Sequence, residues 1–332
     1  MGSSAGKSAR GAGAGRLGAM RSVCSPAALL AVPFALAAFS LAPSSAEAQH
    51  EDWETIEDTG AADEDVGTER VPLRPVVLDP YPGELRLEAA FFTRDVDGVQ
   101  TSFVSPFAEA DYRFHEHAEM VVQMGAAWAK VDEESAARPG NLLLGGRFVQ
   151  ELGTYPWLFE VKAGLEVALP TALLDEDDDF VDNALRLVAW GGASSMRGGR
   201  DLWLWTPDRL SLVVPVAFVS RHPALHLEAS LDVGTLISIE GEDPEVAVQF
   251  LVEGGWRIAE TFLLAAAFSG SAVPTGDGDT FQSALSLLAD LALGEGAGIY
   301  ARLWMNLDDP NGFAFDDDGV WGMTGGVRFG LP

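Results

Sequence analysis

Short runs of carboxylates are the residues of this sequence best placed to bind a metal ion. Two runs stand out, Asp175-Glu176-Asp177-Asp178-Asp179 and Asp316-Asp317-Asp318. Clustered oxygen ligands suit Ca²⁺ or Mg²⁺. The spacing of a calcium-binding loop fails, because the sixth position from Asp175 is Phe180 instead of glycine and the twelfth is Arg186 instead of glutamate. We therefore expect no metal site and no cofactor. We interpret both runs as solvated loops, or as loops that share divalent cations loosely with anionic lipid.

A histidine, a glutamate and a serine at alternate positions, His226, Glu228 and Ser230, superficially resemble a hydrolytic trio. At about 3.3 Å per residue along a strand, His226 and Ser230 would stand about 13 Å apart, beyond hydrogen-bond reach. After residue 48 the sequence contains neither a Gly-x-Ser-x-Gly elbow nor a His-Glu-x-x-His pair. We expect no catalytic residue and no enzymatic activity.

Charged side chains recur at alternate positions of apolar segments, on the face opposite the apolar one. The predicted inward-facing set is Arg113, Arg147, Glu160, Lys162, Glu166, Arg186, Glu228, Asp232, Glu253, Arg257, Arg302 and Arg328. Arg86, Glu88, Glu109, Asp111 and Asp290 fall on the same face and bring the balance to eight cations against nine carboxylates. These charges can pair across strands or line a water-filled passage. The predicted outer loops are acidic by contrast. An acidic mouth concentrates cations, an effect that salt weakens.

The segment 157–169 shows the period on which these assignments rest. Apolar residues occupy every second position from Trp157 to Leu169, with Glu160, Lys162 and Glu166 between them. Side chains alternate faces on a strand, so one face of this segment is continuously apolar. The pattern recurs along the chain with turn residues between segments. It is typical of an all-β fold, an antiparallel transmembrane β-barrel that is apolar outside and polar inside.

Fourteen strands are predicted, and twelve is the alternative. The predicted strands cover 84–92, 103–114, 118–130, 140–152, 156–170, 183–194, 201–206, 208–220, 224–238, 245–257, 261–272, 281–291, 297–306 and 319–330. The region 195–208 decides the count, because long and short connections stop alternating there unless 201–206 is a strand. Pro215 weakens the strand prediction around it, since proline cannot donate a ladder hydrogen bond.

Tryptophans fall near the ends of several predicted strands. Trp128, Trp157, Trp256 and Trp321 suit an interfacial aromatic belt, whereas Trp304 belongs to the inward set. Core tryptophans of a soluble β-sandwich are the alternative. A sandwich of this length would usually divide into domains joined by a linker, and we find none after Pro82.

Residues 1–48 have the pattern of a cleaved signal peptide. Four basic residues precede an apolar run that ends at Ala42, and Ala46-Glu47-Ala48 offers a small-x-small cleavage site. A helical anchor would need about 20 apolar residues, and this run is shorter and contains Pro33. The single cysteine, Cys24, lies in this leader, so we expect no disulfide in the exported chain. Residues 49–82 are acidic and contain several prolines, which predicts a flexible periplasmic arm. The barrel is predicted over 83–332.

Net charge excludes nucleic acid as a partner. The chain has 21 Lys and Arg against 50 Asp and Glu, and the leader takes away four basic residues and one acidic residue. The remainder has 17 against 49, a formal charge of −32. Such a surface repels phosphate backbones. No apolar run after residue 48 is long enough to cross a bilayer as a helix.

The assembled features resemble Gram-negative outer-membrane β-barrel proteins over roughly residues 84–330. The strand ends 166–171 and 272–277 are similar to the apolar-Pro-Thr-Gly ends of the transporter family named for the phenol-degradation meta-pathway. The chain departs from the usual barrel ending, an aromatic last residue, because Phe329 is followed by Gly330-Leu331-Pro332.

Three functions are compatible with these patterns. The first is an outer-membrane channel or porin-like transporter for small solutes or ions, with cation preference set by its acidic loops. The second is a non-conducting barrel that anchors the envelope or presents loops, and the third is a secreted soluble β-protein. The first two place the chain in the bacterial outer membrane, with membrane lipid as its surroundings and an envelope partner for the arm.

Overall fold

The computed structural model describes residues 81–96, 99–174, 180–197, 199–258, 261–275, 281–294, 296–307 and 321–332. The predicted signal peptide, almost all of the predicted arm and both acidic runs, 175–179 and 316–318, lie outside the described residues.

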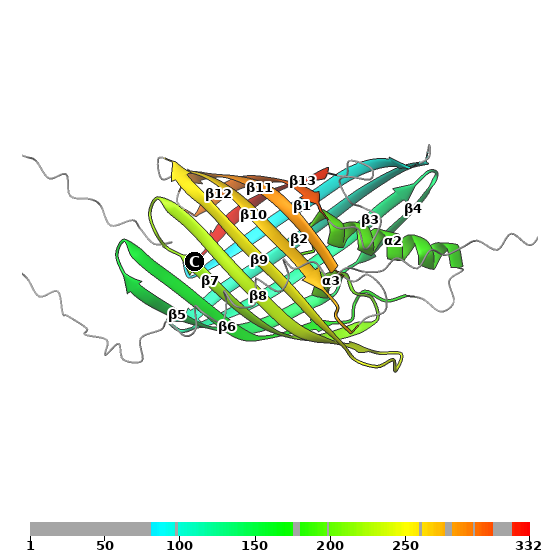
Figure 1. Ribbon diagram of the computed structural model, residues 1–332, viewed down its shortest axis with the longest axis horizontal. Helices are drawn as coiled ribbons and strands as arrows, with labels where there is room; N and C mark the ends of the chain where they lie inside the picture. The colour runs from blue at the N-terminus through cyan, green and yellow to red at the C-terminus, as the bar shows by residue number, and fades with distance from the viewer. Residues whose placement is uncertain are drawn as a thin grey trace, which may run out of the picture.

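The described strands form one antiparallel sheet that closes on itself. They are β1 (Gly83–Val96), β2 (Val99–His115), β3 (Ala118–Val131), β4 (Glu134–Pro139), β5 (Leu142–Thr154), β6 (Trp157–Leu169), β7 (Arg209–Ser220), β8 (Leu225–Ser238), β9 (Glu245–Ile258), β10 (Phe262–Ala272), β11 (Phe281–Gly294), β12 (Ala297–Asn306) and β13 (Trp321–Leu331). Closure follows because β1 pairs with both β2 and β13 and because β2 also pairs with β3. Twelve strands make the ring and β4 is additional, so the alternative of twelve is confirmed and the count of fourteen is wrong. Figure 1 shows the tilted strands wrapping around one axis.

Two predicted strands are helices, which accounts for the difference in count. Segment 183–194 lies in α2 (Phe180–Met196), and segment 201–206 contains α3 (Leu202–Trp205). In α2 the buried positions recur at intervals of three and four, as at Arg186, Ala189 and Ala193. This is the period of a helix with one covered face, and it replaces the period of two that the sequence pattern suggested. None of the described helices is long and apolar enough to span a membrane.

The barrel wall is apolar outside and charged inside. On β6, Leu165 and Leu169 are exposed, whereas Glu160 and Glu166 are buried. Exposed leucines and buried glutamates invert the arrangement of a water-soluble protein. A barrel surrounded by lipid requires this inversion, because hydrocarbon can solvate only the apolar face.

Tryptophans near the strand ends differ in whether their side chains face the outside or the inside of the barrel. Trp157, Trp256 and Trp321 are exposed on the outer face, and Trp128 is partly buried. Trp304 is 3% exposed and lies inside the barrel, as its alternation position indicates. The outward three are placed where an interfacial belt would contact lipid headgroups.

The strand that runs beside β3 is interrupted at Gly140 and Asn141. β4 pairs with one half of β3, with Ala126 opposite Pro139, and β5 pairs with the other half, with Gln123 opposite Leu143. The predicted link 131–139 therefore contains a strand, a correction to the predicted boundaries. We call the end of the barrel that bears β4 and the long connections the loop end, and the opposite end the turn end.

Candidate functional site in the barrel lumen

The connection between β6 and β7 folds into the lumen at the loop end. We call residues 180–197 and 199–206, which include α2 and α3, the plug. Figure 1 shows α2 at the mouth beside β3 and β4, and α3 nearer the barrel body. The plug therefore occupies the loop-end opening of the barrel.

Apolar packing against the barrel wall holds the plug. Trp190, Met196 and Trp203 are each at most 2% exposed and belong to one buried cluster with residues from several sides of the barrel. The inward residues of this cluster include Phe92 of β1, Leu143 of β5, Val213 of β7, Ala247 of β9 and Trp304 of β12. Burying each large apolar side chain contributes about 1.5–3 kcal/mol. The loop-end half of the lumen is thus a packed core.

Two glycines of the wall make room for the tryptophans of α3. A Cβ at Gly125 of β3 would lie 2.5 Å from Cη2 of Trp205. A Cβ at Gly234 of β8 would lie 2.9 Å from Cη2 of Trp203. Real side chains do not approach this closely, so these strands need glycine where the plug sits against them.

The interruption between β4 and β5 supplies polar contacts to the plug. The Asn141 amide nitrogen donates to the carbonyl oxygens of Trp203 at 3.0 Å and Thr206 at 2.7 Å. Its backbone nitrogen donates to the carbonyl of Leu204 at 2.8 Å. Trp190 of α2 donates from Nε1 to the carbonyl of Pro139 at 2.9 Å. The irregular backbone of the plug is thereby satisfied inside the barrel, as a buried segment must be.

Arg197 is the main charged contact between the plug and the wall. It forms an ion pair with Glu88 of β1, and its Nε lies 2.5 Å from Asp201 Oδ2. The guanidinium also lies 3.9 Å from the ring centroid of Phe107, and Tyr300 donates to Glu88 at 2.7 Å. Burial raises the pKa of the Asp201 carboxyl, but Arg197 and Arg200 lower it further, so that its pKa lies below the ordinary value. Asp201 is therefore charged at neutral pH.

The turn-end half of the lumen holds a network of ion pairs. Glu160, fully buried, lies 2.8 Å from Arg113, 2.9 Å from Arg221 and 3.3 Å from Lys162. Glu119 lies 2.6 Å from Lys162. Arg147 contacts Glu166 at 2.6 Å and Glu119 at 3.6 Å. The structure thus brings together five of the predicted inward residues, Arg113, Arg147, Glu160, Lys162 and Glu166. Glu160 and Glu119 are each shared between cations, and Glu166 is paired with Arg147, which compensates the cost of burying these charges.

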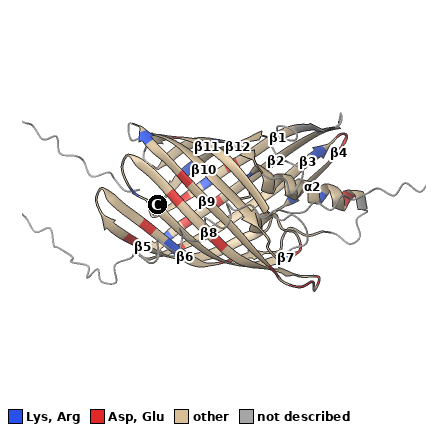
Figure 2. Ribbon diagram, viewed as in Figure 1, with Lys and Arg blue, Asp and Glu red and all other residues tan. Residues whose placement is uncertain are grey.

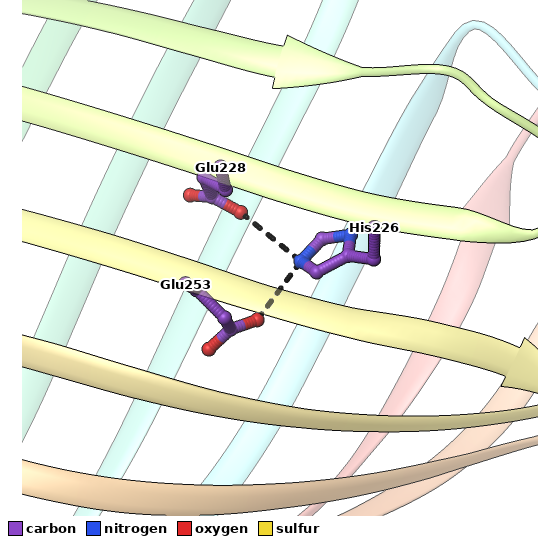
Figure 3. Close-up of side chains that lie close together, drawn as sticks. All are labelled: His226, Glu228 and Glu253. Carbon is purple, nitrogen blue, oxygen red and sulfur yellow. Dashed lines mark hydrogen bonds and ion pairs between the residues drawn. The ribbon is translucent and has the colours of Figure 1, made fainter.

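A smaller cluster lies on β8 and β9. His226 Nε2 is 2.9 Å from Glu253 Oε1 and 3.9 Å from Glu228 Oε2, as Figure 3 shows. The other oxygen of Glu253 lies 2.7 Å from Arg302. These three residues offer one nitrogen and two oxygens within 4.8 Å of one another. Glu228 and Glu253 were both predicted to face inward, and the structure brings them together with Arg302.

The remaining predicted lumen residues lie apart from these clusters. Asp232 accepts from Gln249 at 2.7 Å, and Gln249 in turn accepts from the backbone of Leu202 in α3 at 3.0 Å. Arg328 contacts Asp290 at 3.1 Å. Arg257 is exposed near the turn end of β9. Figure 2 shows charged positions on many strands of the wall. Arg186 is a correction, because it lies on helix α2 rather than on a strand of the wall.

Several lumen residues were missed by the sequence argument. Glu119 shares the face of Val121 and Gln123 on β3, so the alternation already contained its signal. Arg197 and Asp201 follow a helix mistaken for a strand. Arg221 lies in a turn next to Ser220, and only the folded structure brings it to Glu160.

The fold is that of a closed antiparallel barrel whose interior is charged at one end and filled at the other. The crystal structure of an outer-membrane channel from Pseudomonas putida F1 is similar, with a TM-score of 0.55 and 11% sequence identity, over 75% of this chain and 96% of that chain. The NanC porin matches with a TM-score of 0.47 and 8% identity, over 74% and 100% of the two chains. No protein-family model and no curated protein matches this chain. At such identity the likeness to the Pseudomonas structure establishes the fold, and the function has to be argued from the lumen.

Proposed function

We propose that this protein is an outer-membrane channel for small solutes or ions that its plug closes. The observation that carries the proposal is the contrast between the two halves of the lumen. Ion pairs with partly exposed cations line the turn-end half, with Arg113 24% and Arg221 31% exposed at their side chains. The loop-end half is filled by α2 and α3. Charged walls suit a water-filled passage, so solute would cross when the plug leaves its seat.

The wall does not depend on the plug for its strand pairing. β6 and β7 pair directly, with Ala168 opposite Ser211. The plug can therefore move as a unit while the ring of strands stays closed. Passage of this kind needs no covalent chemistry, so we assign no catalytic residue.

Location and selectivity form part of the same proposal. The exposed apolar wall supports a site in the bacterial outer membrane, reached through the signal peptide at 1–48, with residues 49–82 extending into the periplasm toward a partner in the envelope. The acidic runs at 175–179 and 316–318 would lie near the loop-end mouth and give the channel its cation preference.

A disulfide between the plug and the wall tests the gating step. A Cβ at Gly192 of α2 would lie 3.0 Å from Cγ of Phe103 on β2, which is compatible with disulfide geometry. We would introduce Gly192→Cys and Phe103→Cys with Cys24→Ser, so that the two new cysteines are the only ones in the chain. The measurement is ion conductance across planar bilayers before and after reduction. The single-cysteine controls are Phe103→Cys alone and Gly192→Cys combined with Phe103→Ala, because a side chain at position 192 would clash with the Phe103 ring.

We expect conductance from the reduced protein and little from the oxidised protein. Equal conductance in both forms would mean that ions pass a seated plug, and the gating step would then be discarded. No conductance in the wild-type protein, in the reduced variant or in a variant whose plug is replaced by a short linker would reject the channel. The non-conducting barrel, which the filled loop-end lumen favours, would then take its place.

A further inference from the structure

We propose that His226, Glu228 and Glu253 form a binding site for a divalent transition-metal ion such as Zn²⁺ on the inner wall of the barrel. The inference does not depend on the channel function. It rests on how two neighbouring strands place these side chains (Figure 3). The spacing within β8 could not show it, because one ligand comes from β9.

Strand register puts two carboxylates opposite each other. Glu228 of β8 and Glu253 of β9 are direct cross-strand partners. Like charges directly opposite in a sheet destabilise it unless a cation lies between them. Arg302 contacts only one of the two carboxylates, through Glu253 Oε2 at 2.7 Å. Among the side chains in direct contact, two carboxylates and one guanidinium leave a net negative charge, which favours a bound cation.

His226 supplies a nitrogen ligand at the right place. Its side chain is buried, and Nε2 is aimed at both carboxylates. Nδ1 has no hydrogen-bond partner among the described residues. The ring can therefore carry its proton on Nδ1, and a metal ion would then take the Nε2 lone pair in place of the hydrogen bond between Nε2 and Glu253.

The distances fit a small ion after a modest adjustment. Zn²⁺ binds histidine nitrogen and carboxylate oxygen at about 2.0–2.2 Å, which places tetrahedral ligand atoms about 3.4 Å apart. The two separations from Nε2 are 2.9 and 3.9 Å, and all three atoms lie within 4.8 Å. Glu228 is 33% exposed at its side chain, so water from the lumen can complete the coordination. Arg302 holds the second oxygen of Glu253 and would orient that ligand from behind.

Metal binding to the detergent-solubilised protein tests the site. The chain would be purified without a histidine tag and treated with a chelator. It would carry His115→Ala and His117→Ala, because these two rings lie 6.0 Å apart in the turn between β2 and β3 and could bind metal themselves. Zn²⁺ would be titrated in competition with a chromophoric chelator, and Co²⁺ would report the ligand set through its visible absorption.

We expect one equivalent of tight binding, which His226→Gln and Glu228→Gln each weaken at least about tenfold. Asp232→Asn is the matched control, since it replaces a carboxyl group of the same strand that lies outside the cluster, and binding should stay within about twofold. Co²⁺ should give the spectrum of a mixed nitrogen and oxygen site in the parent protein and lose it in His226→Gln.

Three results would overturn the proposal. They are the absence of a tight equivalent in the parent protein, its survival in His226→Gln, or an equal loss in Asp232→Asn. Each would leave His226 hydrogen-bonded to Glu253 and close to Glu228, with no metal-binding role. Electrophoretic mobility in SDS with and without boiling would confirm that each variant is folded. If a variant fails to fold, the Co²⁺ spectrum of the parent protein decides whether a site with nitrogen and oxygen ligands exists.

Discussion

Arg197 joins the plug to the wall through a buried ion pair with Glu88, and its side chain is 4% exposed. Its replacement by methionine keeps the volume but leaves Glu88 and Asp201 without their cation. Breaking a buried pair in this way costs about 3–5 kcal/mol, so the fraction of molecules with an unseated plug should rise at least about a hundredfold. Hydrogen exchange of the α3 amides measures that fraction. Arg200→Gln is the control, because Arg200 influences Asp201 only from a longer range than the ion pair of Arg197 and donates its Nε to the Arg197 carbonyl oxygen, so its change should have a smaller effect. Slow exchange retained in Arg197→Met would contradict the role given to Arg197.

Asp201 gives the seated plug a defined pH dependence. Because its pKa in the folded protein lies below the ordinary value, its contribution to stability is full above the ordinary pKa and is lost as pH falls through the lowered one. Asp208 acts in the opposite sense, since burial raises its pKa. The difference between the wild type and Asp201→Asn isolates the first effect. Near-ultraviolet circular dichroism of the plug tryptophans, followed from pH 7 down to about 3, should fall more steeply in the wild type. Parallel curves would rule out a contribution from Asp201.

At the scale of elements, α3 is positioned by glycines of the wall, whose missing side chains leave room for its tryptophans. Gly125→Ala would place a methyl group 2.5 Å from Cη2 of Trp205, so α3 must shift. We expect faster hydrogen exchange in α3 while the strand amides stay protected. Gly325→Ala on β13 is the matched control, because a Cβ there would meet nothing within 4 Å. Equal effects of the two changes would mean that the response came from the loss of glycine in a strand and not from the plug.

The strands could be predicted closely, and the plug could not. Segments such as 224–238 and 245–257 match β8 and β9 to within one residue, because their side chains face lipid on one side and the lumen on the other. The run Leu202-Trp203-Leu204-Trp205 forms a helix because Gly125, Gly140 and Gly234, far away in sequence, provide room for its tryptophans. Likewise, the pattern within one strand marked Glu228 and Glu253 as inward, whereas the register between strands made them neighbours.

At the scale of the whole molecule, the closed ring should outlast the loss of the plug. A chain in which a short Gly/Ser linker replaces residues 175–207 keeps every strand pairing, because β6 and β7 are already adjacent. We expect both this variant and the wild type to migrate faster in SDS without boiling than after it. A variant without this heat-dependent shift would show that the plug is needed to hold the barrel together.

The electrostatic potential at the loop-end opening depends on the charge distribution of the whole molecule. Changing Asp316, Asp317 and Asp318 to asparagine should reduce cation preference in a conducting protein at low salt, and the difference should shrink as salt rises. Reversal potentials across salt gradients measure it. Identical reversal potentials in the variant and the wild type would remove that loop from the selectivity of the channel.

The closing contact between β1 and β13 also dictates an order of biogenesis. Gly83 pairs with Leu331, so the ring cannot shut until β13 has been synthesised. The plug comes from the middle of the chain, between strands that are neighbours in sequence. We therefore expect α2 and α3 to be in place while the wall is still an open sheet. Pairing of β1 with β13 would then enclose them, so that the newly folded barrel already has its plug seated.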